Sequence, residues 1–133
     1  MEKAKGIDVS HWQGRIDFDK VKSQGYSFVM INAGYGKYIS QKDENFEKNY
    51  AAARKAGLNI GTYWYSYALT EADALAEAKT FLEAVKGKKF EYPLAFDIED
   101  ASQSELPNVA INKITMRLST ATQTFSSARY QTL

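Results

Sequence analysis

The strongest constraint on the fold is the alternation of four short apolar segments with patterns typical of amphipathic helices. The apolar segments cover residues 6–9, 28–31, 58–65 and 92–98, and each is rich in β-branched or aromatic side chains. Their starts lie about 20–35 residues apart, a spacing that is too long for β-hairpins and normal for βα units. The alternation therefore predicts a parallel α/β sheet or a β/α barrel.

Helical spacing is found in each interval between the apolar segments. We predict helices over residues 17–24 and 43–56, and a third that begins after Thr70, where Asp73 completes a variant of the capping box. The apolar stripe of this third helix is predicted to contain Leu75, Ala78, Leu82 and Val85.

The alternation weakens after residue 100. A further helix is predicted over residues 108–118, but residues 119–133 are rich in Ser, Thr and Gln and follow neither the helical nor the strand period. We interpret residues 113–133 as an atypical polar tail.

Composition argues against several classes of function. The 133 residues include 17 basic and 16 acidic side chains, and the net charge of +1 argues against a nucleic-acid partner. Cysteine is absent, which excludes disulfides and thiolate chemistry. No apolar stretch approaches the ~20 residues of a membrane span, and the opening "MEKAKGIDVS" has no secretory core. We expect no membrane partner. If the protein acts outside a cell, another export route is needed or a leader has been removed.

Three carboxylates lie at the expected ends of two strands. Asp97 and Glu99 stand two positions apart at the end of the fourth segment, so they share one side of a strand. Asp8 holds the matching place on the first segment. Because active sites of parallel folds gather at the carboxyl ends of strands, we expect the three acids to converge. Converging carboxylates repel, so one should keep its proton, which is the arrangement that cleaves glycosidic bonds.

The acids at these strand ends are also compatible with two different roles. They could hold Mg²⁺ or Ca²⁺, although "NAGYG" from Asn32 is a poor match for the Gly-rich loop of a phosphate site. Acids at a strand end can also be ordinary helix caps, and we interpret Asp100 as a cap or a solvated residue and not as a catalyst. His11 is the single histidine, so multi-histidine zinc sites are excluded, and we interpret it as a structural hydrogen-bonding residue.

Aromatic side chains gather at the same strand ends as the acids. Their flat faces suit stacking against sugar rings, so they are predicted substrate-binding residues. Trp64 is the exception and is expected in the core, because it points opposite to its two tyrosine neighbours. The predicted sugar-binding residues are Trp12, Tyr35, Tyr63 and Tyr65, with Tyr67 close by.

Four stretches, taken in order, resemble the glycoside hydrolase family 25 lysozymes, which are N-acetylmuramidases of phages, bacteria and some fungi. They are "GIDVSHWQG" from Gly6, "FVMINAGYG" from Phe28, "AGLNIGTYWYSYA" from Ala56 and "PLAFDIED" from Pro93. The resemblance implies a modified TIM-like β/α barrel. It also implies hydrolysis of the bond between N-acetylmuramic acid and N-acetylglucosamine in peptidoglycan, at the bacterial cell wall and without a cofactor.

The resemblance also implies individual roles. Glu99 is similar to the general acid, and Asp97 to the partner that orients or stabilises an attacking acetamido group of the substrate. Asp8 resembles an acid that lines the same cleft. Tyr63 and Tyr65 resemble sugar-contacting aromatic residues.

Two features depart from the family pattern. Asn32 stands where many members carry a basic residue, and loss of that positive charge would raise the carboxylate pKa values. The chain is also short, because complete barrels need ~200 residues. We therefore expect an incomplete barrel of four to five βα units, truncated at its C-terminus, in which residues 1–112 are the N-terminal part of the catalytic domain.

An incomplete barrel has predicted consequences. Val29, Ile31 and Ile60 are expected to face inward and to lack partners, and the chain is expected to associate through an unpaired sheet edge. The alternative to a muramidase is a non-catalytic remnant that at most binds cell-wall glycan.

Overall fold

The computed structural model describes residues 3–117 and has the predicted alternating order. The predicted tail lies outside the described residues from position 118 onward. The described strands are β1 (Gly6–Val9), β2 (Phe28–Tyr35), β3 (Asn59–Tyr65) and β4 (Ala95–Asp97). The helices are α1 (Phe18–Ser23), α2 (Phe46–Lys55) and α3 (Glu71–Val85), with 3-10 turns η1 (His11–Gln13), η2 (Ile39–Gln41) and η3 (Ala101–Gln103). Residues 108–117 are also helical, close to the predicted range.

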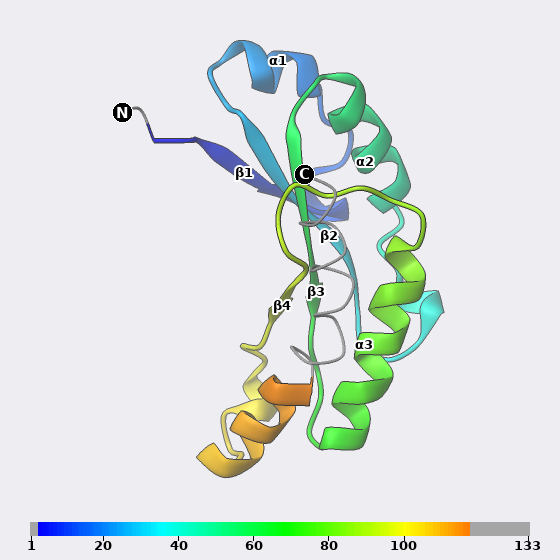
Figure 1. Cartoon of the computed structure of the whole chain (residues 1–133), viewed down its shortest axis with the longest axis vertical. Helices are drawn as coiled ribbons and strands as arrows, with labels where there is room; N and C mark the ends of the chain where they lie inside the picture. The colour runs from blue at the N-terminus through cyan, green and yellow to red at the C-terminus, as the bar shows by residue number, and fades with distance from the viewer. Residues whose placement is uncertain (1–2, 118–133) are drawn as a thin grey trace.

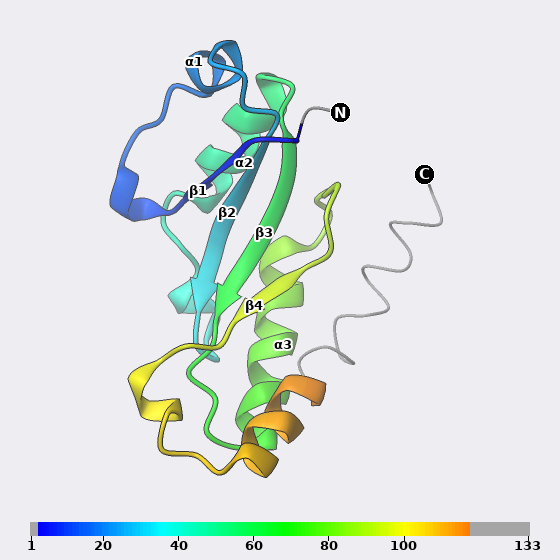
Figure 2. The ribbon, with the colours of Figure 1, turned by 90° about the vertical axis from the view of Figure 1, so that its left-hand side faces the viewer.

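The four strands form one parallel sheet in the order β1-β2-β3-β4 (Figure 1). Figure 2 shows α2 and α3 behind the sheet and α1 beyond the amino ends of the strands, so the other face is left toward the viewer. Phe18 of α1 joins the same core as α2 and α3. Successive βα units with their helices packed on one side build part of a β/α barrel. The predicted fold class is confirmed.

Two strand boundaries differ from the prediction. β2 continues through "NAGY" to Tyr35, with an irregular register between Asn32 and Gly34, because this glycine-containing stretch still pairs with β3. β4 is limited to Ala95–Asp97, so Glu99 lies in the loop that follows the strand and not on it.

The buried face of α3 also differs from the predicted stripe. Thr70 caps the helix as expected, since its side chain accepts a hydrogen bond from the Asp73 N–H. Leu75 is 39% exposed, however, whereas Ala74 and Phe81 are fully buried. Ala78 and Val85 are buried as predicted and Leu82 packs against the core, so the prediction is wrong only for Leu75. Phe81 enters the core as well, because it packs on Trp64 with 5.4 Å between the ring centroids.

The side chains predicted to face the barrel interior face the helices instead. Val29, Ile31 and Ile60 are completely buried in the core between sheet and helices, so the prediction that they lack partners is wrong. Period-2 alternation gives two faces but does not say which one the helices cover. The helix-covered face takes the strongly apolar phase of the strands.

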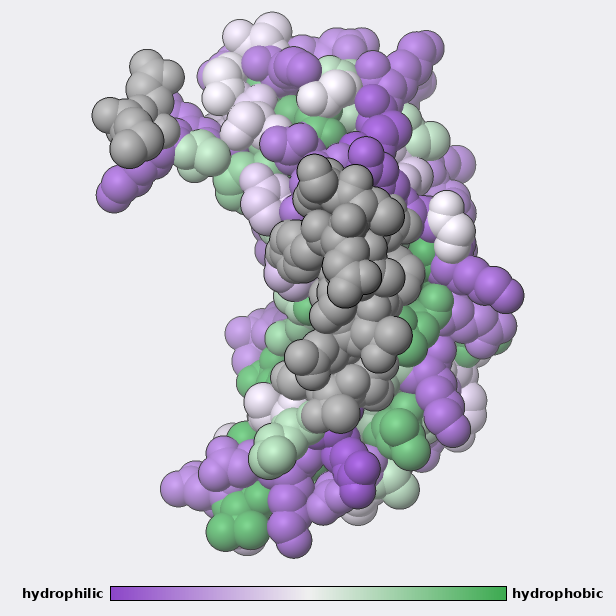
Figure 3. Space-filling view, in the orientation of Figure 1, coloured by the Kyte–Doolittle hydropathy of each residue, from purple (hydrophilic) through white to green (hydrophobic). Residues whose placement is uncertain are grey.

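The opposite, open face has an apolar half at the amino ends of its strands. The Phe28 ring lies across Gly6, where an added Cβ would stand 2.1 Å from it, and the Met30 sulfur lies across Gly61. Tyr92 meets the edge of Phe28, with 5.4 Å between the ring centroids. Figure 3 shows that this side of the molecule is hollowed between the N-terminal segment at the top and the segment after β4 at the bottom.

Candidate active site

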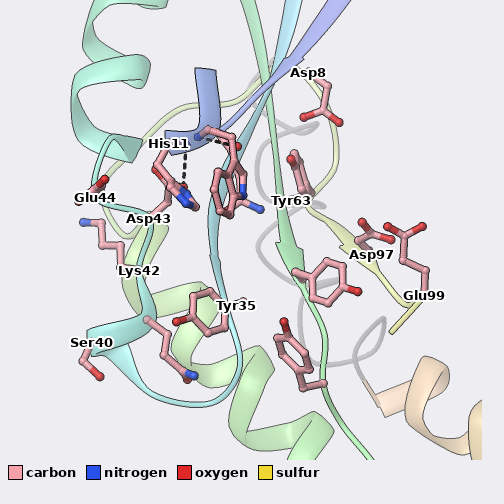
Figure 4. A pocket seen from close by; sticks show the side chains of 16 residues that line it. Asp8, His11, Tyr35, Ser40, Lys42, Asp43, Glu44, Tyr63, Asp97 and Glu99 are labelled. Carbon is pink, nitrogen blue, oxygen red and sulfur yellow. Dashed lines mark hydrogen bonds and ion pairs between the residues drawn. The ribbon is translucent and has the colours of Figure 1, made fainter. Parts of the chain in front are cut away.

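A pocket of about 850 Å³ opens at the carboxyl ends of the strands on the open face. Its lining comes from all four strand ends and from the connection between β2 and α2 (Figure 4). Every site residue predicted from the sequence lines this one pocket: Asp8, Trp12, Tyr35, Tyr63, Tyr65, Asp97 and Glu99.

Asp97 and Glu99 form an interacting pair of carboxyl groups, drawn side by side in Figure 4. Burial raises the pKa of Asp97 to about 6, helped by a hydrogen bond to Glu99 and by the negative charges of Glu99 and Asp8. The expected repulsion is therefore present, and its effect falls on Asp97, whereas the resemblance gives the transferable proton to Glu99. Because the two groups share a hydrogen bond, the proton belongs to the pair.

Tyr63 connects this pair to Asp8. It comes from β3 and faces the pocket between the two aspartates (Figure 4). Burial, followed by hydrogen bonding to Asp8, raises the pKa of Tyr63, so its phenol stays neutral and can donate. Asn32 lies beside it in register and hydrogen bonds to it without adding a positive charge.

Three tyrosines of the pocket, Tyr35, Tyr65 and Tyr67, form an aromatic wall. Tyr67 lies between Tyr35 and Tyr65, with ring centroids 5.8 and 5.0 Å away. Tyr35 and Tyr67 are 44% and 45% exposed, so their faces are accessible to a ligand. Trp12 is more exposed still, at 82%, and stands beside the ring of His11.

Two neighbours of these residues have the structural roles expected from the sequence. Trp64 is fully buried, and its Nε1–H donates to the Gly36 carbonyl over 2.7 Å. Asp100 caps η3 by accepting from the Ser102 N–H, and it also accepts from the Tyr65 hydroxyl over 3.2 Å. Burial and this contact raise the pKa of Tyr65 to about 12.

The wall opposite the acids was not predicted from the sequence. It consists of Ser40, Gln41, Lys42, Asp43 and Glu44, in the connection between β2 and α2. Asp43 joins this wall to the end of β1, because its Oδ2 accepts from the His11 N–H at 3.0 Å and lies 2.8 Å from His11 Nδ1. His11 thus has the structural contact expected of it. The signal that could have found the wall is its position in the connection that follows the carboxyl end of β2.

Two other kinds of site were sought over residues 3–117. Within that range, no three His, Asp or Glu side chains are grouped so that they could hold a metal ion. None of the helices in the same range is both long and apolar enough to cross a membrane.

Comparison with known families decides the relationship. The model described as glycosyl hydrolases family 25 matches residues 7–130. The chain belongs to glycosyl hydrolase family 25. The matched range contains every predicted site residue and all four strands, apart from Gly6 at the start of β1.

Individual members of family 25 and their relatives agree with this assignment. An autolytic lysozyme from Clostridium acetobutylicum is 32% identical over 108 residues, which are 81% of this chain and 32% of that protein. A bacterial lysozyme structure from Streptomyces coelicolor is 30% identical with a TM-score of 0.72, covering 92% of this chain and 60% of that one. A family 25 lysozyme from Aspergillus fumigatus is 26% identical with a TM-score of 0.78, covering 93% and 61%. The chain thus spans about a third of the curated lysozyme and about three fifths of the two solved chains.

Proposed function

We propose that this chain carries the acid-bearing face of a peptidoglycan muramidase, which hydrolyses the bond between N-acetylmuramic acid and N-acetylglucosamine in the bacterial cell wall. The observation that carries the proposal is the interacting Asp97–Glu99 pair, placed beside Asp8 in an aromatic-lined pocket. The names of the relatives support it, since they are lysozymes from bacteria and a fungus.

The acid pair supplies the chemistry of glycosidic cleavage. One proton shared by the pair reaches the leaving oxygen through Glu99, which lies in the loop beyond β4. Loss of that proton leaves two negative charges in the pair, and Asp97 then faces the sugar carbon that becomes positive. In the proposed reaction Asp97 also orients the acetamido group of the substrate as that group attacks the sugar carbon. Water then hydrolyses the resulting intermediate and returns a proton to the acid pair.

The rest of the pocket binds and orients the sugars. Tyr35, Tyr65 and Tyr67 offer ring faces and edges along one wall, and such faces stack on the apolar side of sugar rings. The neutral phenol of Tyr63 donates to Asp8 and fixes that carboxylate beside the acid pair. Trp12 supplies a further exposed ring at the end of β1.

The test is Glu99→Gln, measured as the clearing of a bacterial cell-wall suspension. We expect a loss of about 10²–10⁴-fold with an unchanged thermal midpoint, because glutamine keeps the shape of the side chain and lacks the transferable proton. Glu105→Gln is the matched control, since Glu105 is exposed and outside the pocket. Clearing by Glu99→Gln at the rate of the parent would show that the assignment is wrong.

A glycan-binding protein without activity is the second candidate. It is favoured by the exposed rings of Trp12, Tyr35 and Tyr67 in the pocket, which can contact sugars without any chemical step. In this case neither the parent nor Glu99→Gln clears cell walls, while both sediment with insoluble peptidoglycan. Trp12→Ala should then weaken sedimentation, because it removes an exposed ring from the pocket.

A further inference from the structure

A buried carboxylate lies on α3, outside the pocket and behind it. Glu77 is only 1% exposed and stands between the buried alanines Ala74 and Ala78. Its Oε1 accepts from the Ser66 hydroxyl at 2.6 Å, and its Oε2 accepts from the Tyr67 N–H at 2.8 Å. Within residues 3–117 no lysine, arginine or histidine pairs with it.

Packing alone does not explain this residue. Burial raises the pKa of Glu77, and an apolar side chain would avoid the desolvation of a charge at this position. Both donors that reach Glu77 come from the segment that follows β3, which leads from the aromatic wall into α3. The carboxylate therefore fixes the course of that segment.

The hydrogen bonds continue from Ser66 to the loop that carries Glu99. The Ser66 hydroxyl also accepts from Gln103 Nε2 at 3.4 Å, and the same Nε2 donates to the Ala68 carbonyl at 2.9 Å. Gln103 Oε1 in turn accepts from the Asp100 N–H at 3.3 Å. Gln103 is itself 4% exposed, so these contacts are shielded from water.

Two further contacts bring this network to the reacting groups. The Ser66 N–H donates to the Asp97 carbonyl over 2.9 Å, and Asp100 is the chain neighbour of Glu99. Tyr67, whose N–H is held by Glu77, presents its ring to the pocket. One buried carboxylate is thus connected to the acid pair on one side and to the aromatic wall on the other.

We propose that Glu77 is a positioning residue, which holds the Glu99 loop against the end of β3 through Ser66 and Gln103. Its effect on cleavage rests on the proposed muramidase function, whereas its effect on the acid pair does not. Glu77 touches neither the pocket nor the predicted substrate, so it acts only through the segments that it holds.

A carboxylate is needed because both of its partners donate. Glutamine has the same shape but a single acceptor oxygen, which the Tyr67 N–H requires. Its amide NH₂ group then points at the Ser66 oxygen, which already accepts from Ala68 and Gln103. Glu77→Gln should therefore loosen the link to Gln103 with little change in packing.

The experiment compares Glu77→Gln with Thr80→Val on the same helix. Thr80 is also buried, and its hydroxyl donates to the Lys37 carbonyl at 2.8 Å, so the control removes one shielded hydrogen bond outside the network. The first measurement is the titration of the Asp97 carboxyl group by carbon NMR. Asp97 faces Glu99, Asp8 and Tyr63, and the contact with Glu99 is the one that a shifted loop weakens.

We expect the Asp97 midpoint to fall by about half a pH unit or more in Glu77→Gln, because Glu99 moves away, and to stay in place in Thr80→Val. The second measurement is cell-wall clearing. Its maximal rate should fall by about tenfold or more in Glu77→Gln, with the half-saturating wall concentration unchanged within about twofold.

An Asp97 midpoint that is equal in Glu77→Gln and the parent would overturn the proposal. Failure of the parent to clear walls would overturn the proposed function alone, because the titration still decides the role of Glu77. Gln103→Met cuts the same network from its other end and must lower the Asp97 midpoint as well. It replaces Glu77→Gln should that variant fail to fold, and an unchanged midpoint in Gln103→Met would equally overturn the proposal.

Discussion

The two faces of the sheet differ in what their side chains do. On the helix-covered face, Val29, Ile31, Ile60 and Trp64 are fully buried, and none of them lines the pocket. On the open face, the side chains of the other phase are partly buried or exposed and include Asp8 and Asp97. The comparison shows that one phase of each strand stabilises the fold and the other carries the site.

The open face is itself divided along its strands. At the amino ends, Phe28 and Met30 lie across glycines and make an apolar layer. At the carboxyl ends, Asp8, Tyr63 and Asp97 line the pocket, and the two halves meet where Asp8 stands beside Met30 in register. This division follows from parallel pairing, because all strands end at the same edge and the loops beyond them supply polar groups.

The largest expected effect separates the two faces by stability. Trp64→Ala should lower the free energy of unfolding by about 3–5 kcal/mol, because it empties a fully buried site against Phe81 and removes the hydrogen bond to Gly36. Tyr63→Phe, on the next residue and the opposite face, should cost less than about 1 kcal/mol. Urea denaturation of both variants measures the difference.

Equal losses in the two variants would break the comparison. In that case the open face would contribute to stability as much as the helix-covered face does. A larger loss in Tyr63→Phe than in Trp64→Ala would instead identify the Tyr63–Asp8 contact as a main support of the sheet.

Much of the fold could be predicted from local sequence signals. Thr70 caps α3 where the pattern indicated, and the parallel direction of the strands follows from connections that are too long for hairpins. The phase of the strands could not be predicted, because Val29 and Met30 are both apolar. Likewise the helical spacing alone did not show that Leu75 is exposed and Phe81 buried, because the burial of Phe81 depends on its contact with Trp64.

The site was predictable where it depends on strand ends and not where it depends on loops. Asp8 and Asp97 could be placed because the carboxyl ends of parallel strands meet. Glu99 reaches the same pocket from a loop, so the strand argument gave its position for the wrong reason. Asp43 was missed because its partner His11 lies far away in the sequence. Glu77 was missed because its partner Ser66 lies outside the helix that carries Glu77.

A smaller effect tests whether the apolar half of the open face causes association. We expect the purified chain to associate with increasing concentration, and Met30→Lys to reduce this association, because a charge opposes contact between two apolar surfaces. The cost in stability should stay below about 1.5 kcal/mol, since Met30 is only partly buried. Sedimentation velocity measures the association.

The matched control for this prediction is Met116→Lys. Met116 is 67% exposed and lies on the helix of residues 108–117, away from the sheet. A reduction that is equal in both variants would show that added charge, and not the open face, governs association. No reduction in Met30→Lys would locate the contact elsewhere.

The smallest expected effect concerns the pH dependence of stability at the carboxyl end of the open face. The pKa of Asp97 is raised in the folded chain from 3.8 to about 6, so the folded state binds more protons than the unfolded state between these values. The stability due to the protonated form is fully present below pH 3.8 and is lost as the pH rises through about 6.

The variant Asp97→Asn tests this dependence. Its side chain cannot ionise, so its stability relative to the parent should increase from pH 4 to pH 7. Because Asp97 is partly exposed and screened by solvent, we expect an increase of about 1 kcal/mol, measured by urea denaturation at each pH. When both proteins also carry Glu99→Gln, the stability difference between them should change less with pH, since the hydrogen bond and charge of Glu99 help to raise the pKa of Asp97. A difference that is independent of pH would show that the two carboxyl groups do not interact in the folded chain.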